Sequence, residues 1–257
     1  MGYDYFVALL TATKTEAEGL KRIYKNWSEK SFDNDSQLYY ETWFEREGKK
    51  CKVVTANQNE MGMTASAVLT MKIIEHFRPR YLIMVGIAAG IATEEIEQQE
   101  YGDVIVPTII WDYSAGKFVN AKQADIKYGK IGFIPRPAVF RMDADIEKCV
   151  QRAIESPKNE CHAYMGPMAC GTAVVANREI LDKQILTQFS HTAGLDMESY
   201  AVVYAASNAT SPRPVPIIVK SVSDFADDKK SDQYQKFAVY TSSEFAKLLY
   251  EEFLPMN

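Results

Sequence analysis

The stretch PRYLIMVGIAAGIA, residues 79–92, decides the fold class of this chain. Its residues are apolar at consecutive positions, without the alternation of a half-exposed strand, and the run is broken by glycines. A strand that is buried on both faces has this pattern, and such strands belong to parallel sheets that helices cover on both sides. The stretch therefore predicts a central strand of an α/β sheet.

Strand-like and helical segments alternate on both sides of this stretch. We predict further strands at 5–12, 102–117, 163–177 and 215–225, a hairpin at 40–57, and helices at 14–27, 63–77, 143–155, 178–189 and from about 231. Pro107 predicts an interruption or bulge in its strand. We expect residues 1–257 to form one α/β domain, in which helices flank a mixed, mostly parallel central sheet to give three layers.

Composition and charge exclude several classes of function. Of the 257 residues, 47% are hydrophobic and 25% are charged, which is typical of a globular protein. The formal charge of −5 argues against a general surface for nucleic acids or anionic membranes, and no run of eighteen apolar residues is available to span a membrane. Four widely spaced cysteines and three histidines predict reduced thiols, no metal site and a cytoplasmic protein.

Polar and small residues occur at the ends of three apolar strand segments and at one helix start, where ligands of α/β sheets bind. The segments are TATKTE (11–16), GIAAG (86–90), DMES (196–199) and SVSD (221–224). A structural role competes at each position, because a carboxylate there can be solvated in a first helical turn or can cap a helix or a turn. The residues alone therefore predict an acid-lined rim and no particular reaction.

The order of four motifs carries the interpretation further. They are MVGIAAGI (84–91), GDVIVPT (102–108), GLDMESYAVVYAA (194–206) and IIVKSVSDFADD (217–228). In this order they resemble the nucleoside phosphorylase and nucleosidase superfamily (purine phosphorylase family 1), most of all the methylthioadenosine/S-adenosylhomocysteine nucleosidases and related domains. The resemblance implies a phosphorylase/hydrolase-like fold and hydrolysis of the N-glycosidic bond of a purine nucleoside, which releases the free base and a ribose moiety. It also implies no cofactor and a homodimer or higher homo-oligomer.

Three carboxylates match residues that act on the substrate in this family. Asp224 matches the aspartate that protonates or hydrogen-bonds N7 of the purine, and Glu198 matches the glutamate that holds the ribose hydroxyls. Glu16, in the helix after the first strand, matches the glutamate that activates water. A proton donor at the base and negative charge beneath the sugar both favour an oxocarbenium-like transition state. Asp196 is then expected to cap its helix.

The resemblance also implies seven substrate-binding residues. They are Met197, Ser223, Val174, Val175, Gly86, Ile87 and Ala88. Met197 corresponds to a methionine that packs on the sugar, and Ser223 corresponds to a serine that supports the aspartate. Val174 and Val175 lie where the family sandwiches the base.

Two aromatic, proline-containing loops, 111–118 and 132–140, are expected to close over the 5′ end of the nucleoside, in part from a neighbouring subunit. Arg136 can read a 5′-phosphate or a carboxylate there, or can be a solvated loop residue. Trp111 and Tyr113 are expected to be exposed at a subunit interface.

Water is the expected nucleophile. Phosphorylases of this superfamily bring an arginine toward phosphate three residues before a serine, but Met84 and Ile87 occupy these positions here. Phosphate binding needs several charge-assisted donors, which these side chains do not supply. Two alternatives stay open: a phosphate-dependent purine nucleoside phosphorylase, and a nucleoside-binding module without turnover.

Overall fold

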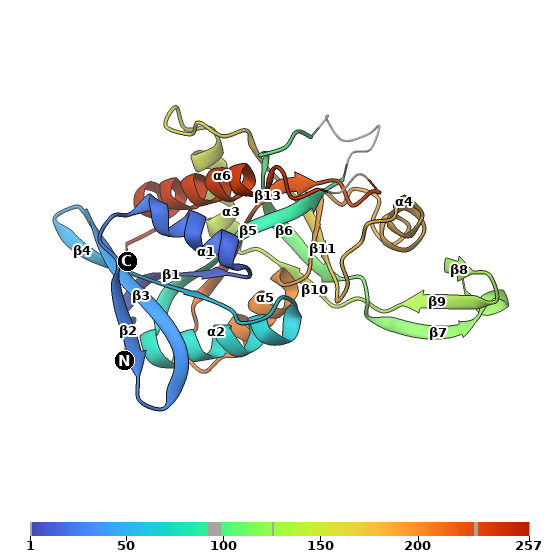
Figure 1. Cartoon of the computed structure of the whole chain (residues 1–257), viewed down its shortest axis with the longest axis horizontal. Helices are drawn as coiled ribbons and strands as arrows, with labels where there is room; N and C mark the ends of the chain where they lie inside the picture. Colours follow the sequence, from blue (N-terminus) through green and yellow to red (C-terminus); the bar gives the residue numbers. More distant parts are fainter. Residues whose placement is uncertain (1, 92–98, 125, 229–230, 257) are drawn as a thin grey trace.

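A ten-stranded mixed sheet forms the middle layer of the computed structural model, which describes residues 2–91, 99–124, 126–228 and 231–256 (Figure 1). Its strands are β1 (Tyr5–Thr11), β2 (Ser28–Phe32), β3 (Asp35–Arg46), β4 (Lys49–Asn57), β5 (Pro79–Gly90), β6 (Val104–Asp112), β10 (Val139–Arg141), β11 (Ala163–Cys170), β12 (Gly194–Asp196) and β13 (Val215–Asp224). Their order is β10-β6-β11-β12-β5-β1-β4-β3-β2, with β13 paired to β5 and β6. At the centre, β5 runs parallel to both β1 and β13, which confirms the predicted α/β sheet.

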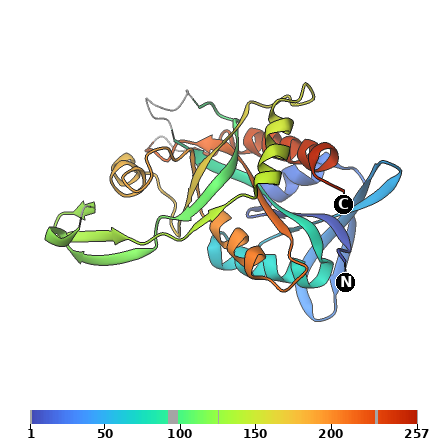
Figure 2. The ribbon, with the colours of Figure 1, turned by 180° about the vertical axis from the view of Figure 1, so that it is seen from behind.

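Helices cover both faces of this sheet (Figures 1 and 2). One face carries α1 (Lys14–Leu20), α3 (Ala144–Ile154) and α6 (Gln235–Leu248), and the other carries α2 (Met63–Phe77) and α5 (Ser199–Asn208). Alternate residues of β1 enter different cores, because successive side chains of a strand point to opposite faces. Val7 and Leu9 pack with residues of α1, α3 and α6. Ala8 and Leu10 pack with residues of α2 and α5.

Several predicted boundaries hold and others shift. The helix predicted at 63–77 is α2, and the strand predicted at 79–92 is β5. Position 92 of that predicted range lies outside the described residues. The helix predicted at 14–27 is too long, because α1 ends at Leu20 and continues only as the 3₁₀ turn Lys21–Ile23. The helix predicted at 178–189 is the short α4 (Arg178–Ile180) followed by a π-helical turn, Leu181–Leu186.

The predicted irregularity at Pro107 is confirmed. Gly166 of β11 lies opposite Pro107 of β6, but the next residue, Pro167, lies opposite Ile109. One extra residue of β6 is therefore inserted directly after the proline, which cannot donate a hydrogen bond to the ladder.

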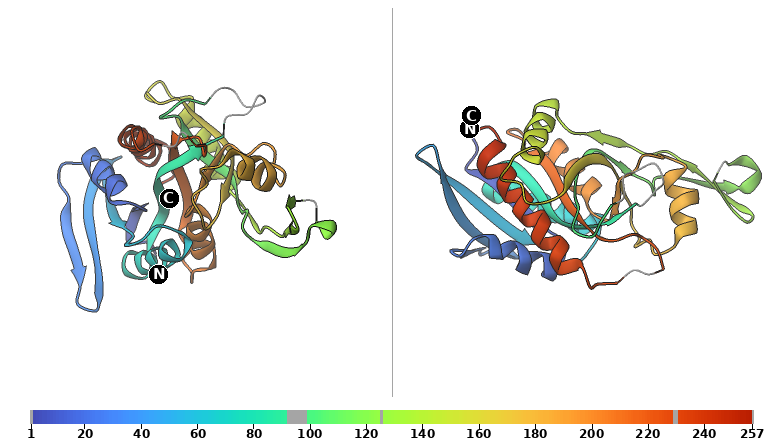
Figure 3. Two further views of the ribbon diagram at one scale, coloured as in Figure 1. Left: turned by 45° about the vertical axis from the view of Figure 1, so that its right-hand side comes forward. Right: turned by 90° about the horizontal axis from the view of Figure 1, so that it is seen from above.

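The prediction of a loop at 132–140 is wrong. This segment contains β9 (Ile131–Pro135) and β10, and β9 pairs with β7 (Gly116–Asn120) and β8 (Ile126–Tyr128) in a separate three-stranded antiparallel sheet. The small sheet projects from the main domain (Figures 1 and 3). None of the described helices is both long and apolar enough to cross a membrane.

Candidate active site

A cavity of about 330 Å³ lies at the carboxyl ends of β1, β5 and β13 and beside the start of α5. Nine of the predicted site residues line it, although they come from distant parts of the sequence. They are Glu16, Ile87, Ala88, Val174, Val175, Met197, Glu198, Ser223 and Asp224. The strand ends meet there because parallel strands present their carboxyl ends at one edge of a sheet.

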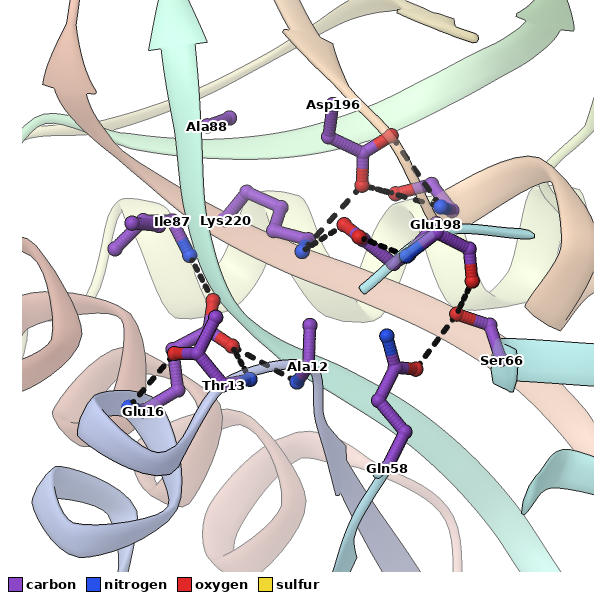
Figure 4. Close-up of polar contacts among 12 residues, drawn as sticks. Ala12, Thr13, Glu16, Gln58, Ser66, Ile87, Ala88, Asp196, Glu198 and Lys220 are labelled. Atoms are coloured by element: carbon purple, nitrogen blue, oxygen red, sulfur yellow. Dashed lines mark hydrogen bonds and ion pairs between the residues drawn. The ribbon is translucent and has the colours of Figure 1, made fainter. Parts of the chain in front are cut away.

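Glu16 is held by backbone donors from two elements. One of its carboxylate oxygens, Oε2, accepts hydrogen bonds from the N–H groups of Ala12 and Thr13, each at 2.8 Å, and Oε1 accepts one from Ile87 at 2.9 Å (Figure 4). Thr13 is the N-cap residue of α1, and its hydroxyl oxygen accepts a hydrogen bond of 3.2 Å from the backbone N–H of Glu16, which completes a capping box. The side chain is only 1% exposed, so the alternative of a solvated first-turn residue is wrong.

Gly86 gives Glu16 the space that it needs. A Cβ atom at this position would lie 2.1 Å from Glu16 Oε1 and 3.2 Å from the Nζ atom of Lys220. Gly86 is not among the residues that line the cavity, and instead lies behind the Glu16 carboxylate. The glycine therefore permits the close approach of two charged groups to β5.

Lys220 is a functional candidate that the sequence reasoning missed. Its Nζ atom lies 3.4 Å from Asp196 Oδ2 and 3.8 Å from Glu198 Oε2, and its side chain is 0% exposed (Figure 4). Burial lowers the pKa of this ammonium, but the charges of Asp196, Glu16 and Glu198 raise it further, so that the net direction is upward. The sequence feature that indicates Lys220 is a lysine within the apolar run VPIIVKSVSD (215–224), where a buried cation needs anionic partners.

Glu198 faces the cavity with one oxygen already bonded. Its Oε1 accepts a hydrogen bond of 2.9 Å from the N–H of Gly62. Burial raises the pKa of the Glu198 carboxyl, the charge of Lys220 opposes this rise, and the charge of Asp196 adds to it. Asp196 has only part of the predicted capping role, because Glu198 is the N-cap residue of α5. The Asp196 carboxylate, two residues earlier, accepts a hydrogen bond of 3.1 Å from the backbone N–H of Ser199, the first residue of the helix.

Asp224 is the last residue of β13, where it lies opposite Ala89 of β5 and lines the cavity. Its Oδ1 accepts a hydrogen bond of 3.1 Å from the N–H of Ala226, and the hydroxyl of Ser223 donates to its Oδ2 at 3.2 Å. These contacts fix the orientation of a buried carboxyl group. The Ser223 hydroxyl therefore helps to hold the Asp224 carboxyl in place.

The two aromatic residues expected at a subunit interface belong instead to a core. Trp111 is 2% exposed and Tyr113 is 4% exposed, and the Trp111 ring lies 6.2 Å from that of Phe189. Phe189 packs with Trp111, and the Tyr113 hydroxyl donates a hydrogen bond of 3.2 Å to Ala173 O, contacts with distant segments that the sequence pattern of a loop does not reveal. Arg136 is exposed at the end of the small sheet, where its N–H bonds to Ala115 O, and it does not line the cavity.

The comparisons with known proteins agree with this architecture. The family model described as the phosphorylase superfamily matches residues 6–255. An ATP nucleosidase, Cap17 of Escherichia coli, is 25% identical over 263 residues, covering 90% of this chain and 48% of that protein. The 5′-methylthioadenosine/S-adenosylhomocysteine nucleosidase of Staphylococcus epidermidis is 25% identical over 203 residues, or 78% of this chain and 82% of that protein.

A solved structure shows the same fold. The 5′-methylthioadenosine/S-adenosylhomocysteine nucleosidase of Neisseria meningitidis, in complex with methylthio-immucillin-A, superposes with a TM-score of 0.74 at 24% identity, covering 96% of this chain and 98% of that chain. The present chain spans about half the length of Cap17 and of one other curated relative.

Proposed function

The chain belongs to the phosphorylase superfamily, and from this premise we propose that it is a nucleosidase that hydrolyses the N-glycosidic bond of a purine nucleoside or a related compound. One observation carries the proposal: Glu16, Glu198 and Asp224 line a single cavity although they lie far apart in the sequence. Binding of a nucleoside alone does not require three carboxylates around one sugar. Relatives that are named nucleosidases support the reaction class.

Each carboxylate has a role that fits its contacts. Asp224, which Ser223 orients, donates a proton to the departing base and so stabilises the leaving group. Glu198 accepts hydrogen bonds from the ribose hydroxyls at the acceptor positions of its carboxylate that the bond from Gly62 N–H does not use. Its negative charge stabilises positive charge on the sugar. Glu16, fixed by three backbone donors, orients the attacking water.

Water fits this cavity better than phosphate as the nucleophile. Among the described residues that line it are five carboxylates and neither a lysine nor an arginine, and the Nζ of Lys220 lies behind the wall, close to two of these carboxylates. A phosphate dianion needs cationic or multiple N–H donors, whereas water is neutral. Ile87, where phosphorylases carry a serine, adds only an apolar side chain.

We also propose that the chain forms a homo-oligomer through the outer face of α2 and α5. Val68 and Met71 of α2 and Tyr204 of α5 are large, exposed and apolar, and the two helices are neighbours. Such a surface is typical of an interface between copies. Sedimentation velocity of the wild type and of Val68→Asp measures the oligomeric state, and the variant is expected to dissociate. The four free cysteines support action in a reducing compartment such as the cytoplasm.

The test is base release from methylthioadenosine, S-adenosylhomocysteine, adenosine, inosine, guanosine, AMP and ATP, with and without phosphate. Asp224→Asn and Glu16→Gln are expected to lower the rate by about 100-fold or more. Asp145→Asn and Glu18→Gln are matched surface controls, since both of these side chains are exposed.

Release without phosphate that is lost in Asp224→Asn supports a nucleosidase. Turnover that requires phosphate contradicts the proposal in favour of a phosphorylase. Binding without any turnover assigns the chain to the nucleoside-binding modules.

A further inference from the structure

A second cavity, of about 520 Å³, adjoins the candidate active site. Met61 and Met197 line both cavities and form the boundary between them. We propose that this second cavity binds the phosphate groups of a 5′-nucleotide, so that the preferred substrates are purine nucleotides. The inference rests on the proposed nucleosidase function, of which it defines the substrate class.

The position of the sugar gives the direction of this extension. The base lies toward Asp224, and the ribose hydroxyls lie on Glu198, whose Oε1 is bonded to Gly62 N–H at 2.9 Å. The sugar is then bounded by Met197 and by the segment Met61–Gly62, both of which also face the second cavity. The remaining substituent, C5′, is attached to C4′, across the ring oxygen from the carbon that carries the base, and the second cavity is the space beyond the residues that bound the sugar.

The second cavity lies at the N-terminus of a long helix that has no capping side chain. Gly62 is the N-cap residue of α2, a helix of 15 residues, and its first turn contains no acidic residue. Thr64 and Ala65 of this turn line the cavity. Within the described part of the chain, no acceptor bonds to the backbone N–H groups of residues 63–65. Free N–H groups and the helix dipole together favour an anion at this position.

A buried amide provides a second and independent observation. Gln58 lines the cavity and is only 3% exposed. The hydroxyl of Ser66 lies 2.7 Å from Gln58 Oε1 and 3.0 Å from Gly62 O, and in this orientation of the amide Gln58 Nε2 is the remaining donor. Among the described residues, Nε2 has no hydrogen-bond partner. A buried donor without a partner costs free energy, and a phosphate oxygen of a bound nucleotide would satisfy it.

The second cavity is also less negatively charged than the first. Lys72, on the α2 face that lines the second cavity, lies against Asp35, and so this pair adds little net charge. Glu60 is the acidic residue in the described lining, and it is exposed, so its carboxylate can turn to solvent. The first cavity is lined by five carboxylates. A phosphate group is therefore much less strongly repelled in the second cavity than in the first.

The test compares kcat/KM for base release from AMP, ATP and adenosine. Thr64→Asp introduces a carboxylate where the helix dipole stabilises it, so folding is retained while a phosphate is repelled. We expect the ratio of kcat/KM for AMP over adenosine to fall about tenfold in Thr64→Asp and in Gln58→Glu, and to rise in Glu60→Gln. Ala144→Asp, which places the same charge at the exposed start of α3, is the matched control.

An unchanged ratio in both acidic variants overturns the inference and leaves the nucleosidase proposal intact. If no compound releases base, the proposed function fails. The inference is then decided by calorimetric titration of AMP and of adenosine into the wild type and Thr64→Asp, which gives the ratio of the two binding constants in each protein. Inorganic pyrophosphate is titrated alone. Binding of pyrophosphate that Thr64→Asp abolishes, without any preference for AMP over adenosine, assigns the site to free phosphates and also overturns the inference.

Discussion

Replacing Lys220 by methionine removes the buried positive charge from a group of carboxylates while keeping much of the side-chain volume. Its Nζ lies 3.4 Å from Asp196 Oδ2 and 3.8 Å from Glu198 Oε2, and Glu16 adds to the negative charge around it. The variant is left with acidic groups that no cation balances. We expect it to be less stable than the wild type and to lose base-releasing activity.

The two distances set the scale of the effect. At an effective dielectric constant of about 20, charges separated by 3.4 Å and 3.8 Å attract each other by about 5 and about 4 kcal/mol. The desolvation of the ammonium group offsets several kcal/mol of this attraction. Loss of one partner of a buried pair costs about 3–5 kcal/mol in the free energy of unfolding, which is the value expected at pH 8.

The loss depends on pH with a definite sign. Burial raises the pKa of Glu198 and Lys220 opposes this rise, so Lys220→Met moves the pKa of Glu198 further up. A carboxyl whose pKa is higher in the folded state than in the unfolded state stabilises the fold below its unfolded pKa, and this contribution is lost as the pH rises through the folded value. The difference between variant and wild type is therefore largest at pH 8 and decreases toward pH 5.

Urea denaturation at pH 5, 6, 7 and 8 measures this difference. Lys14→Met is the control, since this lysine side chain is 89% exposed and its removal is expected to change the free energy of unfolding by less than about 0.5 kcal/mol. A deficit in Lys220→Met that is the same at every pH would refute the electrostatic reasoning and assign the loss to packing. A variant as stable as the wild type at pH 8 would refute the pairing itself.

Two further substitutions test the positions of buried charges. Asp35→Asn is expected to lower the free energy of unfolding by about 3 kcal/mol at pH 7. Burial raises the pKa of Asp35, but hydrogen bonds from Lys72 and Tyr39 lower it overall, so its stabilisation is complete above the unfolded pKa and is lost gradually as the pH falls toward the lower folded pKa. The effect of the substitution is therefore expected to be smaller at pH 3 than at pH 7 by only about 1 kcal/mol, and denaturation at both pH values measures this. Gly86→Ala is expected to displace Glu16 and to lower kcat by about 100-fold. Gly2→Ala, at a position with free space, is its control, and normal activity in Gly86→Ala would contradict the assigned contact.

The sequence predicts the sheet and the meeting of the carboxylates for one physical reason. A strand buried on both faces must be apolar throughout, so the residues of β5 are recognisable without their neighbours. Parallel strands then place their carboxyl ends at one edge. Glu16 and Asp224, which follow or end such strands, must therefore approach one another.

The features that the sequence did not predict depend on contacts between distant segments. Lys220 resembles any lysine in a strand, because its partners lie on another segment: Asp196 ends β12 and Glu198 follows it. The sequence assigns Trp111 to an exposed loop, whereas in the structure its ring packs with that of Phe189. The strand β9 is recognised only with β7, whose sequence GKFVN has no clear apolar alternation.

The distribution of charge connects the reaction with the proposed substrate. The first cavity is acidic, so in the proposed reaction it would stabilise positive charge that develops at C1′ and would repel a phosphate dianion that approaches as a nucleophile. The neighbouring cavity offers the free N–H groups of the α2 N-terminus and the unpaired amide of Gln58. Phosphate is thus disfavoured as a reactant and accepted as a substituent of the substrate. Free phosphate is consequently expected to compete with a nucleotide substrate, and to leave the hydrolysis of an unphosphorylated nucleoside unstimulated.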